Sequence, residues 1–129
     1  AASVDGFAAA RGRSVAAHSF HNGYLKVTDH PQKTHGEIVA LGILVQLAIE
    51  GETDELIKLI AFYRRIGLPY QLSDLGLAPN TSDIQTIAAD MVKPDNARIQ
   101  TVFHNLTQQT VTNAINSLGG DVTRAISTV

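Results

Sequence analysis

The stretch that decides the fold is Thr34-His-Gly-Glu-Ile-Val-Ala-Leu-Gly-Ile-Leu-Val-Gln-Leu-Ala-Ile-Glu-Gly51. Thr34 stands three residues before Glu37, a capping-box pattern that predicts the start of a helix, and Gly51 is typical of a helix end. The segment between them is apolar on nearly all sides, so it escapes water only if neighbours cover both faces. We therefore predict a central helix, in which Gly42 allows a neighbouring backbone to approach closely.

Amphipathic segments flank this central one. Residues 53–66 begin with acidic and end with basic side chains, as the helix dipole favours, and Gly67-Leu-Pro69 ends the segment. No strand pair or internal repeat is visible, so we predict an all-α helical bundle. Further helices are expected at 14–27, 81–91 and 107–118, with a short helical turn or irregular run at 72–77 and a last short helix after Gly120. In residues 14–27 the apolar residues on near-helical spacing are Val15, Ala17, Phe20, Tyr24 and Leu25. In the later helices the residues expected to point inward are Leu56, Ile57, Leu59, Ile60, Tyr63, Val111, Ala114, Ile115 and Leu118.

The composition is that of one domain without disulfides. The chain has 129 residues, 44% of them hydrophobic, and Glu37 and Glu50 interrupt its longest apolar stretch well short of the ~20 residues that span a membrane. Its ten Lys and Arg residues are scattered and its formal net charge is -2, which argues against a nucleic-acid partner. Without cysteine, thiolate chemistry is excluded, and without a signal peptide a cytoplasmic location is expected.

Three of the five histidines are spaced so that the fold could bring them together. His18 and His21 lie three residues apart on one helix face, and His35 follows at the start of the next helix, after one tight return of the chain. Imidazole nitrogens suit Zn²⁺ and Fe²⁺, which makes these residues candidate metal ligands. By spacing alone, surface histidines that bind nothing are the commoner outcome, and no His-Glu-x-x-His pattern completes a three-ligand site.

The other two histidines are predicted to have no part in a site. His30 precedes Pro31 in a polar loop and is expected to be solvated. His104 precedes Asn105 and Thr107, either of which can cap the following helix, so its interpretation is structural.

Four motifs in a fixed order give the chain a family likeness. They are Ala16-Ala-His-Ser-Phe-His-Asn-Gly23, Thr34-His-Gly-Glu-Ile-Val-Ala-Leu-Gly42, Arg65-Ile-Gly-Leu-Pro69 and Thr101-Val-Phe-His-Asn105. Together they resemble the C-terminal helical domain of glycerol dehydrogenase, within the iron-containing alcohol dehydrogenase and dehydroquinate synthase-like superfamily. The resemblance implies a two-domain enzyme, in which an N-terminal α/β domain binds NAD and the helical domain carries a divalent metal, Zn²⁺ or Fe²⁺, in the cleft between them.

The resemblance also implies roles for individual residues. His18 and His35 match the two histidines that hold the metal, and the third ligand, an Asp, would lie upstream of Ala1. His21 matches a neighbouring histidine that would act near the substrate, as a catalytic residue, or beside the metal ligands. Glu37 is expected to cap its helix. A metal held in this way would act as a Lewis acid on an alcohol substrate and so favour hydride transfer to nicotinamide.

Two functions from different classes are compatible with the sequence. In the first, residues 1–129 are a single helical metal-binding domain, a fragment of an NAD-dependent, metal-dependent alcohol or polyol dehydrogenase that forms a homo-oligomer and is inert without its NAD-binding domain. In the second, the chain is a stand-alone, non-catalytic module of the same descent that works through protein contacts. The low content of charged residues, 17% against a typical ~25%, suits a surface that is buried against a partner. The sequence upstream of Ala1 would distinguish the two.

Overall fold

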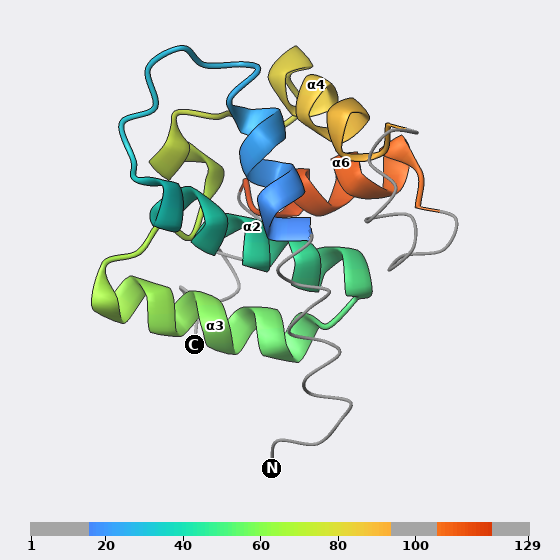
Figure 1. The fold of residues 1–129 in the computed structure, drawn as a ribbon. Helices are drawn as coiled ribbons and strands as arrows, with labels where there is room; N and C mark the ends of the chain where they lie inside the picture. Colours follow the sequence, from blue (N-terminus) through green and yellow to red (C-terminus); the bar gives the residue numbers. More distant parts are fainter. Residues whose placement is uncertain (1–15, 94–105, 120–129) are drawn as a thin grey trace.

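A buried helix, α2, runs through the middle of the computed structural model, which describes residues 16–93 and 106–119 (Figure 1). It spans His35–Glu50, begins with the predicted capping box of Thr34 and Glu37, and ends at Gly51 with φ at 73°. The prediction of a central helix is confirmed, because half of its residues are buried. The buried residues are Ile38, Ala40, Leu41, Gly42, Leu44, Val45, Gln46 and Leu47.

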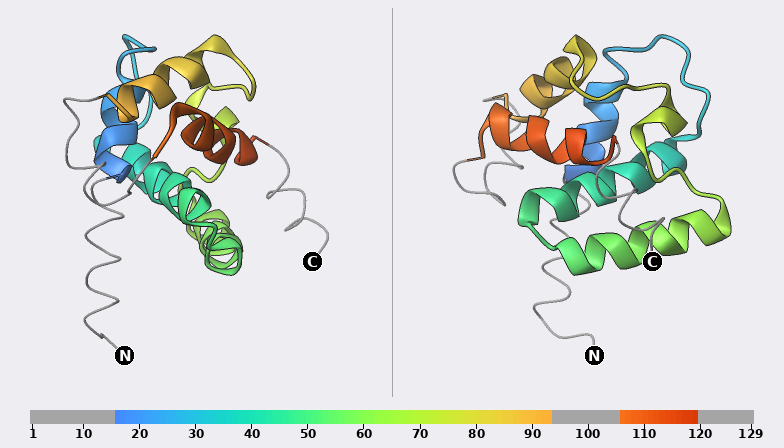
Figure 2. Two further views of the ribbon diagram at one scale, coloured as in Figure 1. Left: turned by 90° about the vertical axis from the view of Figure 1, so that its right-hand side faces the viewer. Right: turned by 180° about the vertical axis from the view of Figure 1, so that it is seen from behind.

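The other helices lie around α2. They are a helix over residues 16–24, α3 at Thr53–Ile66, the short 3₁₀ helix η1 at Leu72–Leu75, α4 at Ser82–Met91 and α6 at Gln108–Ser117. Helix α2 packs against α3 and α6, and α4 packs on α6. In Figures 1 and 2, α3 forms one edge of the bundle, with α2 between it and α4. The described residues contain no strand, so the all-α prediction is confirmed.

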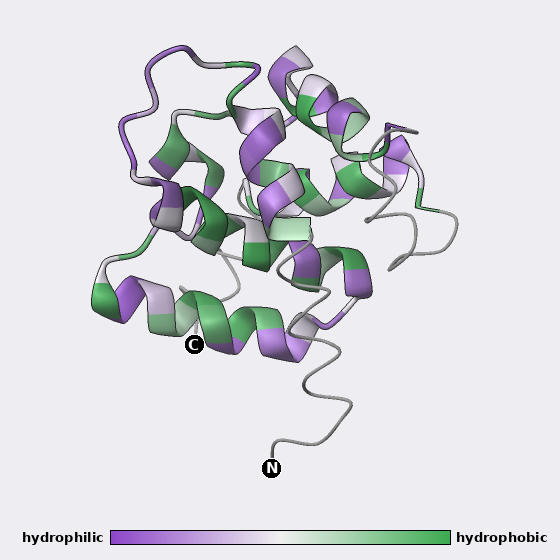
Figure 3. Cartoon of the chain, viewed as in Figure 1, coloured by the Kyte–Doolittle hydropathy of each residue, from purple (hydrophilic) through white to green (hydrophobic). Residues whose placement is uncertain are grey.

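One apolar core joins these elements. Phe20, Leu41, Ile60, Ile87 and Ile115, each from a different helix, are fully buried in it. Figure 3 shows that the loop between the first helix and α2 is largely hydrophilic. Among the residues that the structure describes, no helix is both long and apolar enough to cross a lipid bilayer.

The first helix ends earlier than the sequence predicts. Beyond residue 24 the amides of Lys26 and Val27 donate to the carbonyl oxygens of Gly23 and Tyr24, which makes a turn instead of a further helical turn. Leu25, one of the apolar residues on helical spacing, lies in this turn and is 42% exposed. The predicted end of the helix near Val27 is therefore wrong, because the chain turns after residue 24.

The second half of the chain follows the predicted elements closely. On α3 only the side that faces α2 is buried, so Ile57 and Leu59, expected inward, are just half-buried. The uncertain run at 72–77 contains the 3₁₀ helix, and Thr107 caps α6 by accepting a hydrogen bond from the Thr110 amide. The expected start of the first helix, His104 and the expected helix after Gly120 lie outside the described residues.

The first helix contacts α2 at Gly42, backbone against backbone. A β-carbon placed on Gly42 would lie 2.7 Å from the Ala17 Cα atom and 2.9 Å from the Ala17 carbonyl oxygen. Such distances are shorter than van der Waals contact, and the obstacle is backbone that cannot swing aside as a side chain can. The predicted close approach at Gly42 is confirmed.

We expect Gly42→Ala to destabilise the protein by about 1–3 kcal/mol, because separating the two helices costs more than the ~1 kcal/mol that Ala gains in helix propensity. Gly36→Ala in the same helix is the matched control, since a β-carbon there meets nothing within 4 Å. Urea unfolding should show loss of stability for Gly42→Ala and none for Gly36→Ala. Equal stability of the two variants would contradict the close contact.

A partly buried ion cluster joins the turn after the first helix to α4. The Asp90 side chain, only 10% exposed, accepts a hydrogen bond from Lys26 and lies 3.0 Å from the Lys93 ammonium nitrogen. Burial by itself would raise the pKa of Asp90, but the hydrogen bonds from Lys26 and Lys93 outweigh burial, so the pKa is lowered. The cluster therefore favours the folded state in which Asp90 is ionised.

We expect Asp90→Asn to lower the free energy of unfolding by about 1–2 kcal/mol at neutral pH. Because the folded pKa lies below the ordinary value of about 3.9, the contribution of the carboxylate is fully present above that value and is lost as the pH falls through the folded pKa. Chemical unfolding from neutral to acidic pH should show the gap between wild type and variant closing. Asp29→Asn, in the exposed loop, should match wild type throughout. A gap that does not change with pH would contradict this assignment.

Candidate metal site

Three imidazole rings meet where the first helix passes the start of α2. His18 and His21 lie on successive turns of the first helix, and His35 is the first residue of α2. The ring centroids of His18 and His35 are 5.7 Å apart, and those of His21 and His35 are 4.2 Å apart. The fold thus brings together the three histidines that the sequence analysis selected, while their chemical roles stay predictions.

Helix register explains why these rings meet. On α2, His35 and Gly42 are seven residues apart and so share one face of the helix. On the first helix, Ala17 and His21 share a face for the same reason, four residues apart. Because Ala17 contacts Gly42, the helix faces that bear His21 and His35 also lie against each other, and the two rings meet there.

The capping box fixes the backbone next to His35. The Thr34 hydroxyl accepts a hydrogen bond from the Glu37 amide at 3.2 Å, and the Glu37 carboxylate accepts one from the Thr34 amide at 3.1 Å. Hydrogen bonding from the Thr34 backbone and hydroxyl lowers the pKa of Glu37. Glu37 therefore caps the helix, as predicted, and His35 follows the cap directly.

The surroundings of His21 disfavour its protonated form. Burial lowers the pKa of His21, the nearby His35 and His18 rings lower it further, and a hydrogen bond with the Asn22 side chain opposes them. A neutral imidazole keeps one nitrogen lone pair available as an acceptor. The His21 Nε2 and His35 Nδ1 atoms are 3.1 Å apart, within hydrogen-bond distance.

The donor set suits a divalent metal but does not complete a site. Two imidazoles that share a tetrahedral ion at ~2.1 Å would have ring centroids roughly 5 Å apart, close to the 5.7 Å between His18 and His35. Within residues 16–93 and 106–119, no group of three or more His, Cys, Asp or Glu side chains is arranged to hold a metal ion. His18 and His35 therefore fit as two ligands of a site that needs at least one ligand from elsewhere.

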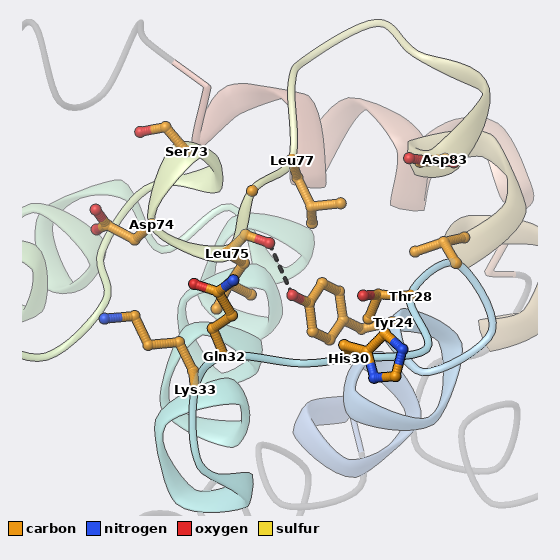
Figure 4. Close-up of a pocket in the computed structure, with 12 residues that line it drawn as sticks. Tyr24, Thr28, His30, Gln32, Lys33, Ser73, Asp74, Leu75, Leu77 and Asp83 are labelled. Atoms are coloured by element: carbon orange, nitrogen blue, oxygen red, sulfur yellow. Dashed lines mark hydrogen bonds between the residues drawn. The ribbon is translucent and has the colours of Figure 1, made fainter.

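A separate cavity of about 430 Å³ lies between the loop before α2 and η1 (Figure 4). The Tyr24 hydroxyl points toward η1 there and donates a hydrogen bond to the Leu75 carbonyl oxygen at 2.7 Å. His30 lines the cavity and is exposed, as predicted. His18, His21 and His35 do not line it, so the cavity is distinct from the imidazole cluster.

Several known proteins are similar to this chain over part of their own length. An uncharacterized oxidoreductase of Synechocystis is 34% identical over 125 residues, which cover 88% of this chain and 31% of the relative. A glycerol dehydrogenase of Pseudomonas putida is 40% identical over 76 residues, which cover 58% of this chain and 20% of the relative. The crystal structure of a probable glycerol dehydrogenase from Sinorhizobium meliloti superimposes with a TM-score of 0.73 and 33% identity over 84% of this chain and 31% of that one.

The chain resembles the C-terminal helical domain of a glycerol dehydrogenase-like protein. It spans between a fifth and a third of the length of these relatives. No protein-family model matches it. The resemblance inferred from the sequence motifs is thereby confirmed.

We expect Thr34→Ala to destabilise this dehydrogenase-like chain by about 1 kcal/mol, because the Glu37 amide loses its acceptor at the start of α2. Thr34→Ser keeps a hydroxyl in the same place and should retain most of the stability. Thermal unfolding of both variants measures the difference. If the two variants were equally destabilised, the methyl group and not the cap would be responsible.

Proposed function

We propose that this chain is a C-terminal, metal-binding fragment of an NAD-dependent dehydrogenase that oxidises a small alcohol or polyol of the glycerol type. The observation that carries the proposal is the approach of the His18 and His35 rings, in a chain that resembles dehydrogenase-like proteins. In this proposal the protein is cytoplasmic and homo-oligomeric, and an N-terminal domain holds NAD.

In this proposal, two histidines of this chain would hold the metal ion. His18 and His35 would each give one imidazole nitrogen to a Zn²⁺ or Fe²⁺ ion, and the Asp expected upstream of Ala1 would complete the set. When bound, the metal supplies Lewis-acid chemistry that makes an alcohol hydroxyl easier to deprotonate. His18 and His35 are exposed, so their nitrogens can reach ligands and substrate contributed from outside these helices.

NAD binding would come from the other half of the enzyme. Dinucleotide sites of this class use a strand, a glycine-rich turn and a helix, whereas the described part of this chain contains helices and no strand. We therefore propose that the isolated chain is inert, because it would keep two metal ligands but lack the third ligand, the cofactor and one wall of the cleft.

The second candidate, a non-catalytic interaction module, rests on a different observation. Phe62 and Ile66, one turn apart on α3, are 47% and 52% exposed. Together they form an apolar stripe on the edge of the bundle, of a kind that often marks a contact with another protein. A module of this sort would retain the imidazole cluster without needing a metal.

We expect His18→Ala or His35→Ala in the full-length protein to abolish metal binding and NAD-linked alcohol oxidation, with losses of more than about 100-fold, since each removes one of few protein ligands. The helical circular dichroism spectrum should be unchanged, because both side chains lie at the surface. His30→Ala, in the exposed loop, is the control and should keep both metal and rate. Metal content by atomic spectroscopy and the rate of NADH formation are the measurements.

Two results would overturn the proposal. If His35→Ala kept its metal and its rate, the assignment of that ligand would be wrong. If the 129-residue chain alone bound NAD⁺ tightly in isothermal titration, the division of labour between two halves would be wrong. A full-length protein without metal and without NAD-linked activity would favour the interaction module.

A further inference from the structure

The outer side of α3 carries the most exposed large apolar side chains of the described residues. Phe62 and Ile66 are 47% and 52% exposed, and Leu59, one turn before Phe62, is half-buried beside them. These three residues lie nearly in line along the helix, because they are spaced by three and four positions, and we call them the α3 stripe. In Figures 1 and 2, α3 lies at the edge of the bundle, on the opposite side of α2 from the first helix.

A row of exposed charged side chains runs beside the α3 stripe. Asp54, Lys58 and Arg65 are displaced from the stripe by about a quarter of a helical turn, all on the same side of it. Asp54 lies in the first turn of α3 and Arg65 in the last, so the row begins with a carboxylate and ends with a guanidinium. The other arginine of the last turn, Arg64, is on a different side of the helix, where it lies over the Tyr70 ring at 5.7 Å from the ring centre.

This charge pattern is complementary to itself when the helix is reversed. If two copies of α3 pack antiparallel about a two-fold axis, the same row of each helix runs along the same edge of the contact. The acidic start of one row then meets the basic end of the other, so Asp54 faces Arg65 of the partner subunit at two equivalent places. Parallel packing would instead place like charges side by side, which is unfavourable.

We propose that the α3 stripe is a contact between two copies of this chain, packed antiparallel, with Phe62 against Leu59 of the partner subunit. The inference rests on the proposed function only in that a homo-oligomer is part of it, and it involves neither the metal nor NAD. The charge pairs set the orientation, and the apolar centre supplies the affinity. One 14-residue helix offers less than the about 800 Å² that each partner buries in a standard interface, so we expect a dissociation constant in the micromolar range.

Sedimentation velocity of the 129-residue chain at increasing concentration tests the contact. We expect the wild type to change from monomer to dimer as the concentration rises to about 0.5 mM, well above a micromolar dissociation constant. Phe62→Glu puts a carboxylate in the apolar centre and should keep the chain monomeric over the same range. Because Phe62 is exposed, the circular dichroism spectrum should not change. Leu25→Glu, at another exposed apolar side chain, is the matched control and should dimerise like the wild type.

Exchanging the two charges tests the antiparallel direction. Asp54→Arg alone places two cations together at each end of the contact, and we expect it to raise the dissociation constant several-fold. Asp54→Arg combined with Arg65→Asp restores opposite charges across the two-fold axis and should bring the dissociation constant back toward the wild-type value. Asp83→Arg makes the same change in the first turn of α4 and should have no effect on dimerisation.

Three results would overturn the proposal. A wild type that stays monomeric at the highest concentration would show that the α3 stripe does not bind a second copy. A dimer that persists in Phe62→Glu would place the contact elsewhere on the chain. A double exchange that dimerises no better than Asp54→Arg alone would exclude the antiparallel arrangement. The metal content of the full-length protein is a separate readout, since its absence would defeat the proposed function and leave the sedimentation result unchanged.

Discussion

The contact between Gly42 and Ala17 is the constraint on which the rest of the structure depends. It lets the first helix rest on α2 with backbone touching backbone, closer than any side chain would permit. His18 is the next residue after Ala17, and His21 lies one turn further, so the contact also sets where both rings stand relative to His35. Gly42 therefore determines both how closely the two helices pack and where the histidine rings lie.

Burial of α2 on all sides makes this constraint effective. Each fully buried Leu, Ile or Val side chain contributes roughly 1.5–3 kcal/mol relative to exposure, and α2 has several of them. The Tyr63 hydroxyl, buried enough to raise its pKa to about 12, donates a hydrogen bond to the Ala40 carbonyl oxygen at 3.0 Å and links α3 to α2. Because α2 is held in this way, its first residue, His35, keeps a fixed position opposite the first helix.

The candidate site lies at the surface of this core, as expected of a site that takes a further ligand from outside these helices. Its rings are exposed or partly exposed, and the described residues contain no group of three or more His, Cys, Asp or Glu side chains arranged to hold a metal ion. Under the proposed function, a ligand from outside the described residues would complete the set.

The local features of the protein could be predicted from its sequence. Capping residues, glycine helix ends and apolar periodicity act within one or two helical turns, which is why α2, α3, α4 and α6 were predicted nearly to the residue, and why the requirement for glycine at position 42 was visible. The histidine spacing indicated that His18 and His35 could meet, and the four sequence motifs indicated the family that the chain resembles. The end of the first helix was predicted too late because the turn after residue 24 carries no strong sequence signal.

Other features depend on contacts between distant parts of the chain, and only the tertiary structure decided them. The ion cluster joins Lys26 to Asp90 across 64 positions, and the Tyr24 hydroxyl meets Leu75 across 51. The 3.1 Å contact between His21 Nε2 and His35 Nδ1 likewise needs the positions of two ring nitrogens, which spacing along the chain does not contain. The sequence thus determined which helices form and which residues could do chemistry, whereas the packing of those helices determined which atoms face one another.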